Sequence, residues 1–162
     1  MKNLLIALFL LTNTFTFAHG DGGFRHSDIF KNLGPNDKVA ILMVHFGTTH
    51  DDTRALTIEA INKKVSQTFP GVEVREAYTS RMIMRRLKEK GMVKLNPTEA
   101  MDKLIADGYT HLILQPTNII EGIEMEALQK EVASYQTKFK DIRLGTALLH
   151  SPEDYQAVVK AI

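Results

Sequence analysis

The chain has 162 residues and contains no cysteine. This absence excludes disulfide bonds, thiolate metal sites and cysteine nucleophiles. Any metal site must therefore use histidine, aspartate, glutamate or backbone oxygen as ligands.

The chain also lacks a strong bias of charge. It carries 20 lysine and arginine residues against 19 aspartate and glutamate residues, a formal net charge of +1 at pH 7. This balance requires neither nucleic acid nor an acidic membrane surface as a partner. No aromatic residue interleaves with the basic residues of segment 81–90, which argues against single-stranded nucleic acid. We therefore expect no nucleic-acid partner.

Several catalytic and nucleotide-binding motifs are missing as well. The sequence has no GxGxxG or P-loop pattern and no GxSxG nucleophile elbow. Its composition, 44% hydrophobic and 24% charged, is ordinary for a soluble globular domain with a hydrophobic core.

The longest apolar run near the N-terminus, residues 4–11, is too short to span a membrane. It follows Lys2 and precedes the small residues Thr16 and Ala18, an arrangement typical of a secretory signal peptide. We predict a signal peptide over 1–18, export to the periplasm and no membrane span after cleavage. An uncleaved N-terminal anchor is the alternative. Residues 19–37, rich in glycine and polar residues, predict a flexible leader.

Residues 38–162 predict one α/β domain, in which a parallel sheet is flanked by helices. The apolar run 39–44 predicts a strand buried on both faces. Further strands are expected at 72–78, 111–115 and 142–148. Helix starts are expected at Asp52, Ser80, Asn96-Pro97, about Ile123, and Ser151-Pro152.

Helical spacing of apolar residues predicts which faces of two of these helices are buried. The first helix should bury Ile58, Ile61, Val65 and Phe69. The last helix should turn Tyr155, Val158, Val159 and Ile162 inward.

Ligands of open parallel sheets bind beyond the carboxyl ends of the strands. The loops 45–52 and 115–124 should therefore lie at one edge of the sheet. They contain four possible ligands for a divalent metal, His45, His50, Asp51 and Glu124. The alternatives are a strand-end histidine bonded to backbone for His45, a polar helix start for His50 and Asp51, and a carboxylate stabilised by a helix N-terminus for Glu124.

Two other features could contact a ligand. The turn Phe46-Gly47-Thr48-Thr49 allows the backbone to approach a ligand closely, or is simply a tight strand-to-helix turn. Segment 81–90 is a short basic helix, and arginine binds carboxylates through paired hydrogen bonds. The alternative is a solvated face. Its basic residues are Arg81, Arg85, Arg86, Lys88 and Lys90.

Four segments in order, covering 38–162, resemble the anaerobic sirohydrochlorin cobaltochelatases, the class II chelatases. Residues 39–53 (VAILMVHFGTTHDDT) resemble the opening strand and FGTS-type loop of that family. Residues 77–87, 118–126 and 144–149 resemble its "aFTSgmIirkL", "hIInGdEye" and "LGvPLL" segments.

The resemblance implies a chelatase-like fold of two similar α/β halves around a cleft, of which this chain is the N-terminal half. It implies insertion of Co(II), or a similar divalent metal, into the tetrapyrrole sirohydrochlorin during anaerobic cobalamin biosynthesis. Glu124 falls on an active-site glutamate of the family, and residues 46–49 fall on the loop that lines the cleft. The resulting predictions are a catalytic Glu124, the metal ligands Glu124 and His45, and the substrate-binding residues His45, Phe46, Gly47, Thr48, Thr49 and Arg85.

The chain also departs from the family pattern. Many members have a small residue at His45, related small chelatases have their histidine ligand at Phe46, and a relative has histidine at Asn118. The family's principal histidines lie in a second half, so the expected partners are a missing C-terminal half or a second copy in a homo-oligomer. The alternative function is a non-catalytic periplasmic protein that binds haem, another tetrapyrrole or a metal.

Overall fold

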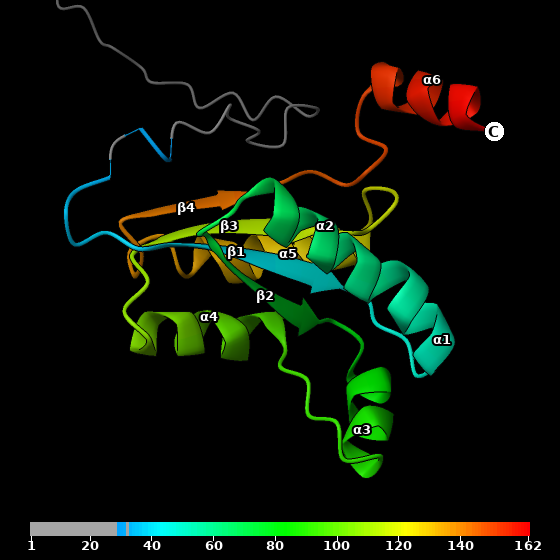
Figure 1. The fold of residues 1–162 in the computed structure, drawn as a ribbon, viewed down its shortest axis with the longest axis horizontal. Coiled ribbons are helices and arrows are strands. Elements are labelled where there is room, and N and C mark those ends of the chain that lie inside the picture. The colour runs from blue at the N-terminus through cyan, green and yellow to red at the C-terminus, as the bar shows by residue number, and fades with distance from the viewer. Residues whose placement is uncertain (1–28, 32) are drawn as a thin grey trace, which may run out of the picture.

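The computed structural model describes residues 29–31 and 33–162. The predicted signal peptide 1–18 and the first part of the predicted leader lie outside the described residues. The described chain contains four strands, which form one all-parallel sheet in the order β2-β1-β3-β4 (Figure 1). The strands are β1 (Val39–His45), β2 (Glu73–Tyr78), β3 (His111–Pro116) and β4 (Asp141–Leu144).

Helices follow each strand, which confirms the predicted α/β class. After β1 comes one helical segment of α1 (Asp51–Arg54), the π-helical turn η1 (Ala55–Glu59) and α2 (Ala60–Thr68). The others are α3 (Arg81–Glu89), α4 (Pro97–Ala106), α5 (Ile123–Ala133) and α6 (Pro152–Ala161). Helices α4 and α5 cover one face of the sheet, and α2 covers the other (Figure 1). We call these the α4–α5 face and the α2 face.

The main hydrophobic core lies on the α4–α5 face. Alternate residues of β1 point into it, because successive side chains of a strand project to opposite faces. The core is continuous across strands and helices. Its buried residues are Ala40, Leu42, Val44, Ala77, Ala100, Met101, Leu104, Leu112, Leu114, Leu128, Val132, Tyr135 and Phe139.

Local sequence signals explain where α4 begins. Asn96 accepts a hydrogen bond from the backbone N–H of Glu99, whose carboxylate accepts one from the Asn96 N–H, each at 2.9 Å. Pro97 occupies the first turn, where its missing N–H costs no intrahelical bond. This capping box confirms the predicted helix start.

The prediction for the first helix is only partly correct. The helix begins at Asp51, with His50 rather than Asp52 at the N-cap position. Ile58 is buried, but Ile61 and Phe69 are exposed, and α2 itself contributes no fully buried residue. The apolar spacing identified the helix, yet spacing alone does not say how closely the helix packs on the sheet.

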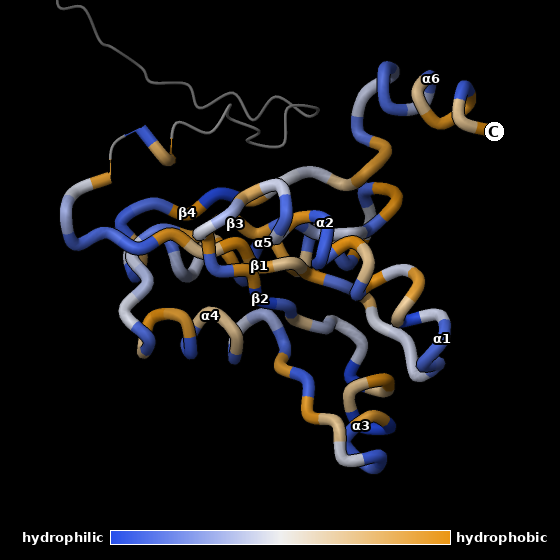
Figure 2. The backbone as a smooth tube through the Cα atoms, viewed as in Figure 1, coloured by the Kyte–Doolittle hydropathy of each residue, from blue (hydrophilic) through white to orange (hydrophobic). Residues whose placement is uncertain are grey.

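The predictions for the C-terminal part need two corrections. The fourth strand ends at Leu144 instead of Leu148, because the following backbone bonds to neighbouring loops: the Leu148 N–H donates to the Asn118 carbonyl at 2.9 Å. Helix α6 begins at Pro152 with Ser151 as its N-cap, as predicted, but it stands apart from the sheet (Figures 1 and 2). Its apolar residues, predicted to face inward, are exposed: Tyr155, Val158, Val159 and Ile162.

In the described part of the chain, no helix combines the length and apolar character that crossing a membrane requires.

Candidate functional site

The carboxyl ends of β1, β2 and β3 are tied together by backbone hydrogen bonds. The N–H of Thr79, after β2, donates to the His45 carbonyl at 2.8 Å, and the N–H of Thr117, after β3, donates to the Val44 carbonyl at 2.9 Å. The loops after all three strands therefore meet at one edge of the sheet. This confirms that the two predicted ligand-bearing loops share an edge.

Gly47 allows the loop after β1 to pass close to Tyr78. Its φ is +98°, a conformation that favours glycine. A Cβ at this position would lie 2.4 Å from Cδ2 of the buried Tyr78 ring. The turn 46–49 thus needs glycine for its backbone conformation and for its packing.

The remaining residues of this turn are at least partly accessible. The Phe46 side chain is 50% exposed, and Thr48 and Thr49 are half-buried. Lys90 donates from Nζ to the Thr49 carbonyl at 3.1 Å, which links the end of α3 to the turn. Phe46 and the two threonines are therefore accessible to a ligand, and their role in substrate binding stays a prediction.

His45 lies at the end of β1 with 1% of its surface exposed. Its Nδ1 is 3.0 Å from Thr117 Oγ1, and its Nε2 is 3.0 Å from Asn62 Oδ1 on α2. The alternative interpretation is a strand-end histidine hydrogen-bonded to backbone groups. His45 does lie at the strand end, but its partners are two side chains. Metal or substrate binding by His45 stays a prediction, and it requires one of these hydrogen bonds to break.

The His45 contacts continue into a polar network on the α2 face. Asn62 donates from Nδ2 to Glu76 Oε2 at 2.8 Å, and Lys94 pairs with the other oxygen of Glu76. Burial lowers the pKa of His45 despite the opposing effects of the Asn62 hydrogen bond and the Glu76 charge. Because Asn62 donates to Glu76, its oxygen accepts from His45, so the neutral imidazole carries its proton on Nε2.

Sequence reasoning missed most of this network. It included Thr117 in a candidate loop but assigned no role to Asn62, Glu76 or Lys94. The available signal was Glu76, a carboxylate inside the strand 72–78, because a charged residue in a covered strand needs a partner.

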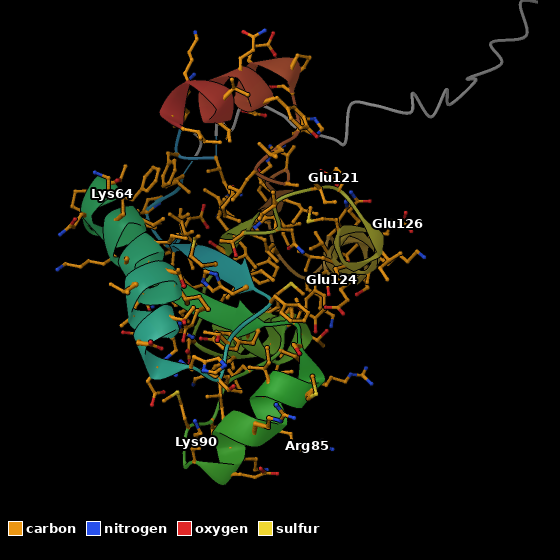
Figure 3. All side chains as sticks on the ribbon, turned by 90° about the vertical axis from the view of Figure 1, so that its right-hand side faces the viewer. Lys64, Arg85, Lys90, Glu121, Glu124 and Glu126 are labelled. Carbon is orange, nitrogen blue, oxygen red and sulfur yellow. The ribbon has the colours of Figure 1, made fainter. Side chains whose placement is uncertain are left out.

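Glu124 lies in the first turn of α5, where the helix N-terminus stabilises negative charge. It is half-buried, and its Oε2 accepts a hydrogen bond from Asn118 Nδ2 at 3.0 Å. No described residue is hydrogen-bonded to Oε1. Figure 3 shows Glu124 on the side of α5 toward α3, with Glu126 on the outer side. The carboxylate is therefore oriented by Asn118 and keeps one oxygen for a ligand.

Glu124 borders two hollows at this edge. The larger, about 420 Å³, is a groove between α3, the start of α4, and α5. The smaller, about 250 Å³, is a shallow hollow lined by the loop 118–123 and the start of α5. We call the larger one the α3–α5 groove. Its lining residues are Thr79, Arg81, Met84, Asn96, Pro97, Thr98, Glu124, Ala127, Leu128 and Glu131.

Other predicted residues do not join this groove. Arg85 is exposed on α3 and is not among the lining residues. His50 and Asp51 form a polar helix start, as their alternative reading proposed, and Asp51 pairs with Arg54 at 2.9 Å. Within residues 29–31 and 33–162, no cluster of three or more His, Asp and Glu side chains could hold a metal. The metal role of Glu124 stays a prediction.

Comparison with known proteins identifies the family. A sequence model of the cobalt chelatase (CbiK) family matches residues 39–162. The sirohydrochlorin cobaltochelatase of Salmonella typhimurium is 34% identical over 126 residues, which are 77% of this chain and 48% of that protein. Sirohydrochlorin cobaltochelatase CbiKC of Nitratidesulfovibrio vulgaris is 29% identical over 130 residues, 79% of this chain and 46% of that protein.

The chain thus spans about half the length of the curated relatives it matches. The match covers the sheet, the turn 46–49, Glu124 and the α3–α5 groove. Together with the parallel α/β fold, it shows that this chain belongs to the cobalt chelatase family.

Proposed function

We propose that this chain forms one wall of the tetrapyrrole cleft of a sirohydrochlorin cobaltochelatase. The reaction is the insertion of Co(II), or a similar divalent metal, into sirohydrochlorin. The family membership and the activity named for both relatives support this proposal. Neither relative's name, nor any described contact, favours haem as the ligand.

The observation that carries the proposal is the position of Glu124. Metal insertion requires a group that handles the entering cation and accepts the pyrrole N–H protons that the metal displaces. Glu124 borders both hollows, is oriented by Asn118 at 3.0 Å, and has an oxygen without a described partner. A carboxylate held in this way can perform either step.

The turn 46–49 would supply contacts to the macrocycle. The exposed Phe46 ring can stack on a flat conjugated ligand. Gly47 keeps the turn close to Tyr78. The buried His45, which directly precedes the turn, is held by hydrogen bonds to Thr117 and Asn62. In this proposal His45 is a positioning residue that holds the start of the turn in place.

A second wall must come from elsewhere. We propose that it is a C-terminal half on the same or a separate polypeptide, with a second copy of this chain as the alternative. The share of the relatives that the chain spans and the exposed apolar residues of α6, such as Val159 at 74% exposure, support a missing neighbour.

We also propose that the protein is exported to the periplasm through the signal peptide at 1–18. The sequence pattern supports this placement. Mass spectrometry of the protein recovered from a periplasmic extract should give a mature N-terminus near His19. An intact Met1 would contradict the cleavage.

Cobalt insertion itself provides the direct test. The absorbance change of sirohydrochlorin with Co(II) is followed with the chain alone and with the C-terminal half of the Salmonella relative added separately. Glu124→Gln should lower the insertion rate on the order of 100-fold, because proton transfer by a placed side chain contributes about that much. Glu126→Gln, on the outer side of α5, is the matched control and should leave the rate unchanged. Absence of insertion in both settings would contradict the enzymatic proposal.

A further inference from the structure

Among the described residues that line the α3–α5 groove, one has a cationic side chain, Arg81. It is the first residue of α3 and follows Ser80, whose side chain accepts a hydrogen bond from the Ile83 N–H. This cap fixes where α3 begins and therefore where Arg81 projects. Met84 lines the groove one turn further along the same helix.

Arg81 has no partner among the described residues, whereas the carboxylates of the groove do. Asn118 donates to Glu124 at 3.0 Å, and Thr98 donates to Glu131 at 3.4 Å. No hydrogen bond or ion pair joins Arg81 to any residue in 29–31 or 33–162. Its guanidinium therefore keeps all its donors for a ligand, in a geometry that matches a carboxylate.

The start of α4 adds to the attraction for an anion at this place. Asn96, Pro97 and Thr98 line the groove, so the N-terminus of a ten-residue helix lies beside it. A helix N-terminus carries a partial positive charge that favours a nearby anion. Arg81 and this helix end together make one part of the groove suitable for a carboxylate, next to the apolar Met84 and Ala127.

We infer that Arg81 binds a carboxylate side chain of the tetrapyrrole substrate in the α3–α5 groove, with the macrocycle edge near Met84 and Ala127. This inference rests on the proposed function and adds a binding residue to it. The sequence singled out Arg85 as the arginine for substrate. Arg85 lies one turn later on the same helix (Figure 3) and does not line the groove.

The pair Arg81 and Arg85 offers a matched test, because both are exposed arginines on α3. Binding of uroporphyrin I, which has a carboxylate on every side chain, is measured by fluorescence quenching with the full chain. Arg81→Gln should raise the Kd about tenfold, the effect expected from losing one charge-assisted pair. Arg85→Gln should leave the Kd close to that of the unmodified chain. Arg81→Lys, which keeps the charge without the paired geometry, should fall between them.

A cationic porphyrin without carboxylates, tetra(N-methylpyridyl)porphyrin, separates specific binding from damage to the fold. Arg81→Gln should bind this probe at least as well as the unmodified chain, since a positive charge has been removed. Equal uroporphyrin affinity for Arg81→Gln and Arg85→Gln would overturn the role of Arg81 alone. Absence of binding of either porphyrin by the unmodified chain would overturn the proposed function as well.

Discussion

The two faces of the sheet are built from different chemistry. On the α4–α5 face, 13 buried residues form one apolar cluster across three strands and two helices. On the α2 face, a smaller apolar cluster of Ile58, Tyr78 and Leu87 lies beside a polar network. In that network, hydrogen bonds and an ion pair link His45, Asn62, Glu76 and Lys94. Helix α2 contributes no fully buried residue there.

The two faces therefore have different roles: the α4–α5 face provides most of the folding stability, and the α2 face positions the turn 46–49. Apolar burial on the α4–α5 face is the main source of folding free energy, because it removes a large hydrophobic area from water. The polar network on the α2 face contributes less net stability, since each of its hydrogen bonds replaces one to water. The network instead holds the end of β1 in one orientation, and this sets the direction in which the turn 46–49 leaves the strand.

The largest contrast is expected from truncating one apolar residue on each face. Leu104→Ala should lower the free energy of unfolding by about 3 kcal/mol, because Leu104 is completely buried and its loss leaves a cavity. Ile61→Ala on α2 should cost less than about 1 kcal/mol, since Ile61 is already 39% exposed. Urea denaturation followed by circular dichroism measures both. Equal losses would show that the α2 face carries as much of the core.

A smaller effect is expected from the pH dependence of the α2 face. The unfolded His45 titrates near its ordinary pKa of 6.5, and burial lowers the pKa in the folded chain. The unfolded state therefore binds the proton first as the pH falls. The stability gained from neutral His45 is complete above pH 6.5 and is lost as the pH drops through the folded pKa, by at most about 1.4 kcal/mol per pH unit.

Unfolding measured between pH 7.5 and 5 should show this loss, a range of roughly one unit or more on either side of the ordinary histidine pKa. His45→Gln should flatten the profile, whereas His50→Gln, an exposed control, should keep it. A profile that His45→Gln leaves unchanged would mean that the network is indifferent to the protonation of His45.

The smallest effect is expected from two tyrosine hydroxyls, one on each face. Tyr78, against the α2 face, is fully buried, no described residue bonds its hydroxyl, and burial raises its pKa to about 12. Tyr78→Phe should raise stability by about 1 kcal/mol, because an unpaired buried hydroxyl is removed. Tyr135, on the α4–α5 face, donates to Asp102 at 2.7 Å, so Tyr135→Phe should lower stability by about 1 kcal/mol. Thermal unfolding distinguishes the two signs.

Much of the fold could be predicted because its signals are local. The apolar run of β1, the Asn96-Pro97 start of α4 and the burial of Met125, Leu128 and Val132 on α5 follow from spacing and capping. The exposure of α6 could not be predicted, because periodicity shows that a helix has an apolar face and not what covers it. The end of β4 at Leu144 depends on hydrogen bonds to distant loops.

The candidate site, like the fold, could be predicted only in part. Parallel strands place their carboxyl ends at one edge, so the sequence could bring the turn 46–49 and Glu124 to the same region. It could not choose between Arg81 and Arg85, because only the packing of α3 against α4 and α5 determines which arginine borders the groove. Nor could it pair His45 with Asn62, since that contact requires α2 to cross the sheet at one particular position.

The amino-acid sequence by itself determined the order of strands and helices, the α/β class, the capped helix starts and the resemblance to the chelatases. These properties depend on residues that are neighbours in the chain or on short periodic patterns. Only the tertiary structure decided which face holds the larger apolar core, that both nitrogens of His45 have partners, that α6 is uncovered and that Arg81 lines the groove. Each of these depends on contacts between residues far apart in sequence, and such contacts are set by how whole elements pack.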